Sequence, residues 1–140
     1  MPLKIYLAGT TSATEYRTYC KRHCPKNIEL LDPLHNTAKL LKDNNLKSIS
    51  DIGPDVGNKI VKDDKSMIKR SDCIMAWFNY STVGTTMEIH LAYTLGIPVY
   101  VINPRMLMCN DIWLRYHSTK FFSSITSCFD FIVKEHYCEN

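Results

Sequence analysis

The chain has 140 residues, of which 45% are hydrophobic and 22% are charged, and its formal net charge is +3. These values are typical of one soluble globular domain, so we expect a single domain that spans residues 1–140. A net charge this small gives no reason to expect nucleic-acid binding, and no apolar run is long enough to span a membrane.

Six cysteines raise the question of disulfides or a metal site. The sequence starts with Met1-Pro-Leu-Lys4 and leads directly into a strand pattern, so we expect no secretory signal and reduced thiols in a cytoplasmic protein. Cys20, His23 and Cys24 could share one helical turn, but their spacing matches no zinc motif. We therefore expect neither a metal ion nor another cofactor.

Strand and helix patterns alternate along the chain. We expect strands at residues 3–8, 27–31, 72–78, 99–102 and 120–125. We expect helices at residues 13–23, 34–44 and 55–70, after the turn at 83–85, and, behind a cap at Ser127, up to about Tyr137. Residues 44–54 are polar and should loop over the sheet edge, and residues 104–118 should be irregular with some helical character.

This alternation predicts an α/β fold in which a parallel sheet has helices on both faces. Five strands in a chain of this length favour a flavodoxin-like open sheet with the strand order 2-1-3-4-5. Such sheets bind ligands beyond the carboxyl ends of their strands, where the strand order reverses. The turns at residues 9–12 and 79–86 should meet at that point, after the first and third strands.

Glu88 is an acid on the apolar face of the helix that follows the third strand. Glu88, Leu91, Ala92 and Leu95 fall on one helical face, which should pack on the sheet. A carboxyl group aimed at a core costs free energy unless it has partners or a chemical role. The alternative is an ordinary acid near a helix start, where it would complement the helix dipole.

A second acid and a tyrosine should share the crevice with Glu88. Asp64 falls on the apolar stripe of the preceding helix with Ile60, Met67 and Ile68, unless the phase of that helix is misjudged. Two carboxyl groups in different environments can act as a nucleophile and a general acid. Tyr6, in the first strand, could place a buried hydroxyl beside a carboxylate, with plain core packing as the alternative.

Three segments of the chain carry a family resemblance. They are Lys4-Ile-Tyr-Leu-Ala-Gly9, residues 63–72, and Gly84-Thr-Thr-Met-Glu-Ile-His-Leu-Ala92 with Gly96-Ile-Pro-Val99. Over roughly its first 104 residues the sequence resembles the nucleoside 2-deoxyribosyltransferase family, whose superfamily includes the 2'-deoxynucleoside 5'-monophosphate N-glycosidases. The resemblance implies the flavodoxin-like fold and cleavage of a base–sugar bond.

The resemblance also implies roles for the three residues of the crevice. Glu88 matches the family's nucleophile, which forms a covalent glycosyl intermediate, and Asp64 matches the acid that handles the proton of the leaving base. Tyr6 matches the tyrosine that orients the nucleophile. We expect the position of Glu88 in the first turns of its helix to help keep it ionised.

The residues expected at the 5' end of the substrate leave two alternatives open. At the position of Thr82, transferases that act on free nucleosides usually carry an aspartate, whereas the monophosphate glycosidases carry a hydroxyl residue for phosphate. Gly84 belongs to the same signature. Tyr6 is the transferase-like choice.

The turn after the first strand could also hold a 5'-phosphate. Hydroxyl groups and backbone N–H groups at a helix start suit an anion. Arg17 could replace the arginine that some monophosphate hydrolases carry nearby. The predicted substrate-binding residues of this turn are Gly9, Thr10, Thr11 and Ser12.

The family completes its active site with residues from a neighbouring subunit, in the segment after the fourth strand. Asn110, Asp111 and Arg115 are the candidates here, so we expect a homodimer or larger homo-oligomer with a shared active site. The expected ligand is a nucleoside or nucleotide. A non-catalytic nucleotide-binding module on the same fold is the main alternative, and a flavin or redox protein is disfavoured because no C-x-x-C motif is present.

Overall fold

A single parallel sheet forms the centre of the computed structural model, which describes residues 1–79, 82–106 and 109–137. Its strands are β1 (Leu3–Ala8), β2 (Ile28–Leu31), β3 (Cys73–Trp77), β4 (Val99–Ile102) and β5 (Lys120–Phe122). Every neighbouring pair is parallel and the order is β2-β1-β3-β4-β5, which confirms the predicted fold and strand order. Short, continuously apolar strands suit a sheet that is covered on both faces.

Helices connect the strands and begin where the sequence supplies start signals. The helices are α1 (Thr14–Arg22), α2 (Pro33–Asp43), α3 (Pro54–Lys69), α4 (Val83–Thr94), α5 (Ile112–His117) and α6 (Ile125–Tyr137), with a short 3₁₀ turn at Ile49–Asp51. Proline stands at the first position of α2 and of α3, where its missing N–H costs no hydrogen bond. Asp32 caps α2 by accepting from the backbone N–H of Leu34 at 3.0 Å.

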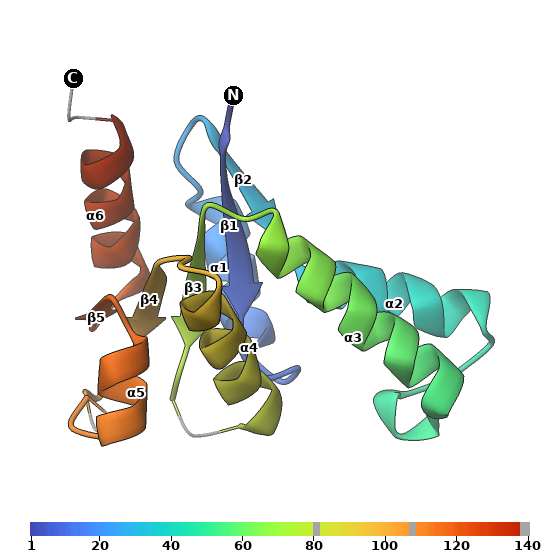
Figure 1. The fold of residues 1–140 in the computed structure, drawn as a ribbon. Coiled ribbons are helices and arrows are strands. Elements are labelled where there is room, and N and C mark those ends of the chain that lie inside the picture. Colours follow the sequence, from blue (N-terminus) through green and yellow to red (C-terminus); the bar gives the residue numbers. More distant parts are fainter. Residues whose placement is uncertain (80–81, 107–108, 138–140) are drawn as a thin grey trace.

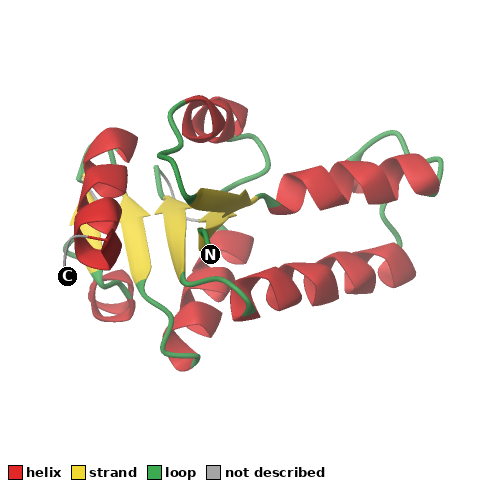
Figure 2. Ribbon diagram, turned by 90° about the horizontal axis from the view of Figure 1, so that it is seen from above, coloured by secondary structure: helices red, strands yellow, loops and turns green. Residues whose placement is uncertain are grey.

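Helices lie on both faces of the sheet (Figure 2), and an apolar layer is buried on each face. Along β1, Ile5 and Leu7 point to the layer that α1 and α6 cover, whereas Tyr6 and Ala8 point to the opposite layer. That opposite layer contains Ile68 of α3, Ile89 of α4 and Leu114 of α5. The alternation along the strand therefore aims Tyr6 at the helices that carry Asp64 and Glu88.

Helices α2 and α3 extend together beyond the β2 edge of the sheet, at the right of Figure 1. Residues 44–53 join their far ends, away from the sheet (Figure 1). The prediction that this segment loops over the sheet edge was therefore wrong.

Other local predictions also need correction. The buried face of α4 is formed by Thr85, Ile89 and Ala92, while Leu95 is 44% exposed, so the predicted helical phase was shifted. Helix α6 begins at Ile125, two residues before the predicted cap. The Ser124 hydroxyl accepts from the backbone N–H of Ser127 at 3.2 Å, which makes Ser124 the capping side chain. Helix α5 supplies the helical character that was predicted for residues 104–118, whereas β5 is shorter than predicted.

The side chain of Tyr137 joins the two ends of the described chain at the amino-terminal edge of the sheet. Its hydroxyl donates to the carbonyl oxygen of Asn27 at 2.7 Å and accepts from the backbone N–H of Leu3 at 3.2 Å. In the described ranges, no helix has the length and apolar character needed to cross a membrane.

Candidate active site

A cavity of about 380 Å³ lies beside the turn that follows β1. Gly9 and Thr11 of this turn line it together with Arg17 of α1. Asp64 of α3 and Glu88 of α4 form part of its wall. The cavity therefore lies beyond the carboxyl end of a central strand, where an open α/β sheet binds its ligands.

A second cavity, of about 490 Å³, lies between α3 and α4. Asp64 and Glu88 line this cavity too, together with Gly84 at the start of α4 and the apolar side chains of Ile68 and Leu91. The two predicted acids thus stand in the shared wall of both cavities. The predicted proximity of Asp64, Glu88 and the two turns is what the fold produces.

Two carboxyl oxygens in this wall, and one hydroxyl oxygen buried behind it, have no hydrogen-bond partner in the described part of the chain. They are the hydroxyl oxygen of Tyr6, Oδ1 of Asp64 and Oε2 of Glu88. A buried polar atom without a partner costs about 1–3 kcal/mol, so native folds rarely keep one without a reason. The two carboxyl oxygens make this wall the candidate site for a ligand.

Burial shifts the ionisation of both carboxyl groups. Burial, with a smaller contribution from Asp64, raises the pKa of Glu88 to about 7, against the opposing effects of the Tyr6 hydroxyl and Arg17. Burial and the neighbouring Asp63 raise the pKa of Asp64 to about 6, while Arg17 lowers it. Burial, followed by the two carboxyl groups, raises the pKa of Tyr6 well above its usual range, so its hydroxyl stays protonated.

The expectation that a helix start keeps Glu88 ionised was wrong. Helix α4 begins at Val83, which puts Glu88 in the second turn. The effect of the helix dipole falls off within the first turn, and here the cost of burial exceeds it. Glu88 is therefore only partly ionised near neutral pH.

The turn that was predicted to hold a phosphate is itself held by Arg17. The Arg17 guanidinium donates to the carbonyl oxygens of Gly9 and Thr10 at 3.0 and 2.8 Å, and its Nε donates to Asp32 at 3.2 Å. The hydroxyl oxygens of Thr10 and Ser12 lie 3.3 Å apart. These bonds hold the turn in place. Because they use most of the N–H groups of Arg17, the geometry does not favour its predicted role as a phosphate ligand.

The residues predicted to meet the 5' end of the substrate lie at the start of α4. Thr82 is the residue before the first turn of α4, and its hydroxyl donates to that of Thr85 at 2.7 Å. Gly84 faces Glu88 so closely that a Cβ atom there would lie 3.9 Å from Oε1. Ser81, which was predicted together with Thr82, lies outside the described residues.

The residues predicted to complete a neighbouring subunit's site lie apart from Glu88. Asn110 is exposed. Asp111 caps α5 by accepting from the backbone N–H of Leu114 at 2.9 Å. Asp111 also lines a third cavity, of about 390 Å³, with His90 and Trp113. The same chain therefore does not bring these two residues to the cavities that contain Glu88.

Sequence reasoning missed the outer wall of the first cavity. Thr37 of α2 and Ile49 and Ile52, from the segment that joins α2 to α3, contribute to that wall. Two isoleucines within a polar stretch were the signal that this segment packs against something. It also missed the bond between Arg17 and Asp32, which belong to segments that only the fold brings together.

The described thiols are buried or partly buried. The five described cysteines are free, and Cys20, Cys73 and Cys128 are fully buried in the α1–α6 layer. Burial raises the pKa of Cys20 and Cys73 to about 12, so these thiols are unreactive. No group of three or more metal-binding side chains occurs among the described residues.

Known protein structures share this fold. A conserved protein from Enterococcus faecalis V583 has a TM-score of 0.68 and 21% sequence identity, over 96% of this chain and 99% of its own. A 2-deoxyribosyltransferase from Bacillus psychrosaccharolyticus has a TM-score of 0.65 and 18% identity, over 91% of this chain and 90% of its own. A 2-deoxyribosyltransferase from Leishmania mexicana has a TM-score of 0.62 and 19% identity, over 96% of this chain and 99% of its own. No family model and no curated protein matches the sequence.

Proposed function

We propose that this protein is an N-glycosyl enzyme that cleaves the base–sugar bond of 2'-deoxynucleosides or of their 5'-monophosphates. One observation carries the proposal: Asp64 and Glu88 share the wall of two cavities, and each keeps a buried carboxyl oxygen without a partner among the described residues. The fold shared with two 2-deoxyribosyltransferases supports it. A purely structural role for both acids would leave the cost of burying them uncompensated.

The proposed reaction has two steps. In the first step a carboxylate oxygen of Glu88 attacks C1' of the sugar, the bond from C1' to the base nitrogen breaks, and its electron pair goes to the base. Asp64 delivers a proton to the leaving base, which avoids the release of an anion. In the second step water or another base attacks C1', the bond to Glu88 breaks and its electron pair restores the carboxylate, and the proton of the attacking group goes to Asp64.

Tyr6 supports the first step from behind the wall, where it is fully buried and its hydroxyl acts on Glu88. Burial keeps its hydroxyl protonated, so it can donate to Glu88 but cannot compete with it as a nucleophile. A donor fixed by a central strand also limits the rotamers of the carboxylate. We assign Tyr6 the role of orienting Glu88 towards C1'.

The 5' end of the substrate meets hydroxyl and backbone groups in this proposal. At the position of Thr82 a carboxylate would repel phosphate, and the Thr82 hydroxyl, which donates to Thr85 at 2.7 Å, would turn to donate to the phosphate instead. Gly9 and Thr11 line the first cavity next to the start of α1, and Thr10 and Ser12 belong to the same turn. We therefore propose that a 5'-monophosphate is accepted, and that it is preferred over the free nucleoside.

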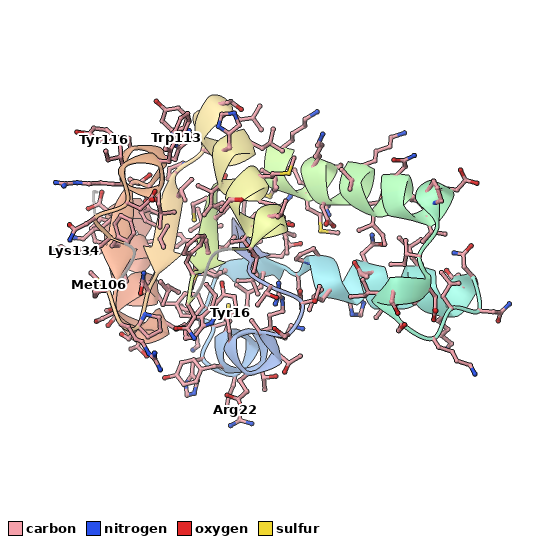
Figure 3. The ribbon with its side chains drawn as sticks, turned by 90° about the horizontal axis from the view of Figure 1, so that it is seen from below. Tyr16, Arg22, Met106, Trp113, Tyr116 and Lys134 are labelled. Atoms are coloured by element: carbon pink, nitrogen blue, oxygen red, sulfur yellow. The ribbon has the colours of Figure 1, made fainter. Side chains whose placement is uncertain are left out.

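We also propose that the enzyme works as a homo-oligomer in which Asn110 and Asp111 approach the site of a neighbouring subunit. The surface of α4 and α5 supports this, because Val83, Ile112 and Trp113 are 77%, 71% and 75% exposed. Figure 3 shows Trp113 and Tyr116 projecting outward from α5. Exposed apolar side chains clustered in this way are typical of interaction surfaces.

The test is an assay for released base. The protein is incubated with each 2'-deoxynucleoside and each 5'-monophosphate, with and without a second free base, and the products are separated by chromatography. Free base without an acceptor indicates hydrolysis, and a new nucleoside indicates transfer. Nucleotide binding without any released base would instead favour the non-catalytic binding module and would reject the proposed reaction.

A further inference from the structure

Arg17 is a buried cation in the wall of the first cavity. Its side chain belongs to α1, and the residue is only 4% exposed. The same cavity is lined by Asp64 and Glu88. Among the described residues that line this cavity, Arg17 is the one with a positive charge. In surroundings that exclude water, such a charge acts over a longer distance than it would at the surface.

Hydrogen bonds fix the guanidinium in place. Nη1 donates to the carbonyl oxygens of Thr10 and Ala13 at 2.8 and 3.3 Å, Nη2 donates to that of Gly9 at 3.0 Å, and Nε donates to Asp32 at 3.2 Å. These bonds use four of the five N–H groups of the fork. Arg17 is therefore held in the turn and does not form a direct ion pair with Glu88 or Asp64.

Asp32 does not fully neutralise Arg17. The Asp32 side chain, 7% exposed, also lies 2.7 Å from Nζ of Lys21. It accepts in addition from the backbone N–H of Leu34 at 3.0 Å. One carboxylate shared by two cations leaves the cluster with a net positive charge next to the cavity.

We propose that Arg17 is a positioning residue of this site. It holds the turn at residues 9–13 in place, and its fixed positive charge stabilises the carboxylate forms of Asp64 and Glu88. The inference rests on the proposed function, because it assigns Arg17 to the same reaction. A direct ion pair would engage the nucleophile's oxygen, whereas a cation held at a distance favours the carboxylate and leaves Oε2 of Glu88 without a partner among the described residues.

The ionisation of the surrounding groups is consistent with this role. Arg17 lowers the pKa of Glu88, of Asp64 and of Tyr6, and in each case burial acts in the opposite direction. The other charged or titratable groups that face this cluster are Asp63 beside Asp64, Tyr16 and Cys20 on α1, and the Asp32–Lys21 pair. Asp63 opposes the effect of Arg17 on Asp64.

The test measures the ionisation of Asp64 and Glu88 directly, by following their carboxyl carbons in a ¹³C NMR pH titration. Arg17→Gln removes the charge, and both titration midpoints should move upward by about half a pH unit or more. Arg17→Lys keeps a charge but loses the fork, so its shift should be smaller. Arg22→Gln is the matched control, because it removes the charge of an exposed arginine on the same helix. It should leave both midpoints in place.

A second variant covers the case in which Arg17→Gln does not fold. Citrulline at position 17 is a neutral side chain of nearly the same shape, and Cys20 allows a synthetic peptide of residues 1–19 to be ligated to the rest of the chain. The same upward movement of both midpoints is expected. Unchanged midpoints in a folded Gln or citrulline variant would restrict Arg17 to a structural role and overturn the proposal.

The titration does not depend on turnover, so the two proposals can fail separately. If wild type releases no base but both midpoints move, the proposed reaction is rejected and the effect of Arg17 on the two acids stands. If wild type is active, the acidic limb of kcat/KM should move upward together with the midpoints in Arg17→Gln. A rise in KM alone, with an unmoved limb, would indicate that Arg17 only shapes the turn.

Discussion

Asp64 on α3 and Glu88 on α4 line the same two cavities, although the two residues reach them from different helices. Burial is the main cause that raises the pKa of each, to about 6 and about 7. Between these values the pair holds a single proton. With these values the proton rests mainly on Glu88, so the proposed reaction proceeds through the less populated one-proton form, in which Glu88 is ionised and Asp64 can donate.

The first prediction concerns the pH dependence of base release. Below about pH 6 both acids are protonated and no nucleophile is available, and above about pH 7 both are ionised and no acid remains. The plot of kcat/KM should therefore be bell-shaped with its maximum near pH 6–7, and its limbs belong to the pair rather than to either residue. With a substrate whose leaving group needs no proton, the alkaline limb should disappear. A plateau up to pH 9 with natural substrates would contradict the assignment.

Glu88→Ala should lower the rate of base release by more than about a hundredfold, because a covalent nucleophile is lost. The fold should persist, since the side chain forms a cavity wall. Glu135→Ala, at an exposed position of α6, is the matched control and should keep its activity. In wild type, a nucleoside with fluorine at the 2' position of the sugar should leave a stable sugar adduct on Glu88, which peptide mass spectrometry can locate. An active Glu88→Ala enzyme would end the nucleophile assignment.

Asp64→Asn should slow natural nucleosides far more than nucleosides with an activated leaving group, because only the former need a proton. Asp63→Asn provides the control from the adjacent position. The Asp63 carboxylate accepts from Asn36 at 2.9 Å and from Lys59 at 3.3 Å, so it is engaged elsewhere. The measurement is the ratio of kcat/KM for the two substrate types. An equal loss for both in Asp64→Asn would assign Asp64 to structure.

Stability should also depend on Glu88. Its pKa in the folded chain, about 7, lies above its usual value of 4.5, so the folded state binds more protons between these values and stability falls as the pH rises through that window. Glu88→Gln removes this cost. The variant should be more stable than wild type at pH 8, by about 1–3 kcal/mol, and similar to it near pH 4.5. Urea unfolding at both pH values measures the difference, and an equal stability at pH 8 would contradict the burial of the ionised group.

Thr82→Asp should reverse the preference for a 5'-monophosphate over a free nucleoside. A like charge at contact distance in a partly buried site costs about 1–3 kcal/mol, so the ratio of the two kcat/KM values should change by roughly tenfold to a hundredfold. Aspartate is a good residue before a helix start, so the fold should tolerate it. Thr82→Asn has the same shape without the charge and should change the ratio far less. If wild type uses only the free nucleoside, the phosphate assignment is wrong.

The sequence was most informative where its pattern was one-sided. Polar and apolar residues divide cleanly along α3, and that helix packs in the phase that places Asp64 in the wall. The buried face of α4 was predicted with a shifted phase because this helix carries apolar residues on several sides. Met87 is 66% exposed and Tyr93 is 54% exposed. Such a pattern leaves the buried face to be chosen by tertiary packing.

The electrostatics of the site lay beyond sequence reasoning. Arginine is almost never buried unless it is paired, so nothing local marks Arg17 as a buried residue. Its burial depends on Asp32, which lies in the turn between β2 and α2 and meets Arg17 only in the assembled fold. The ionisation of Glu88 likewise depends on desolvation, which no spacing of residues encodes.

The Tyr137 hydroxyl has a topological consequence. Its hydrogen bonds to Leu3 and Asn27 hold the end of the last helix beside the start of the first strand, so the two ends of the described chain lie close together. The join lies at the amino-terminal edge of the sheet, near the start of β1 in Figure 1. The first cavity lies beside the turn after β1, at the carboxyl edge. A surface attachment or fusion at either end of the described chain would therefore leave the mouth of the site facing away from the attached body.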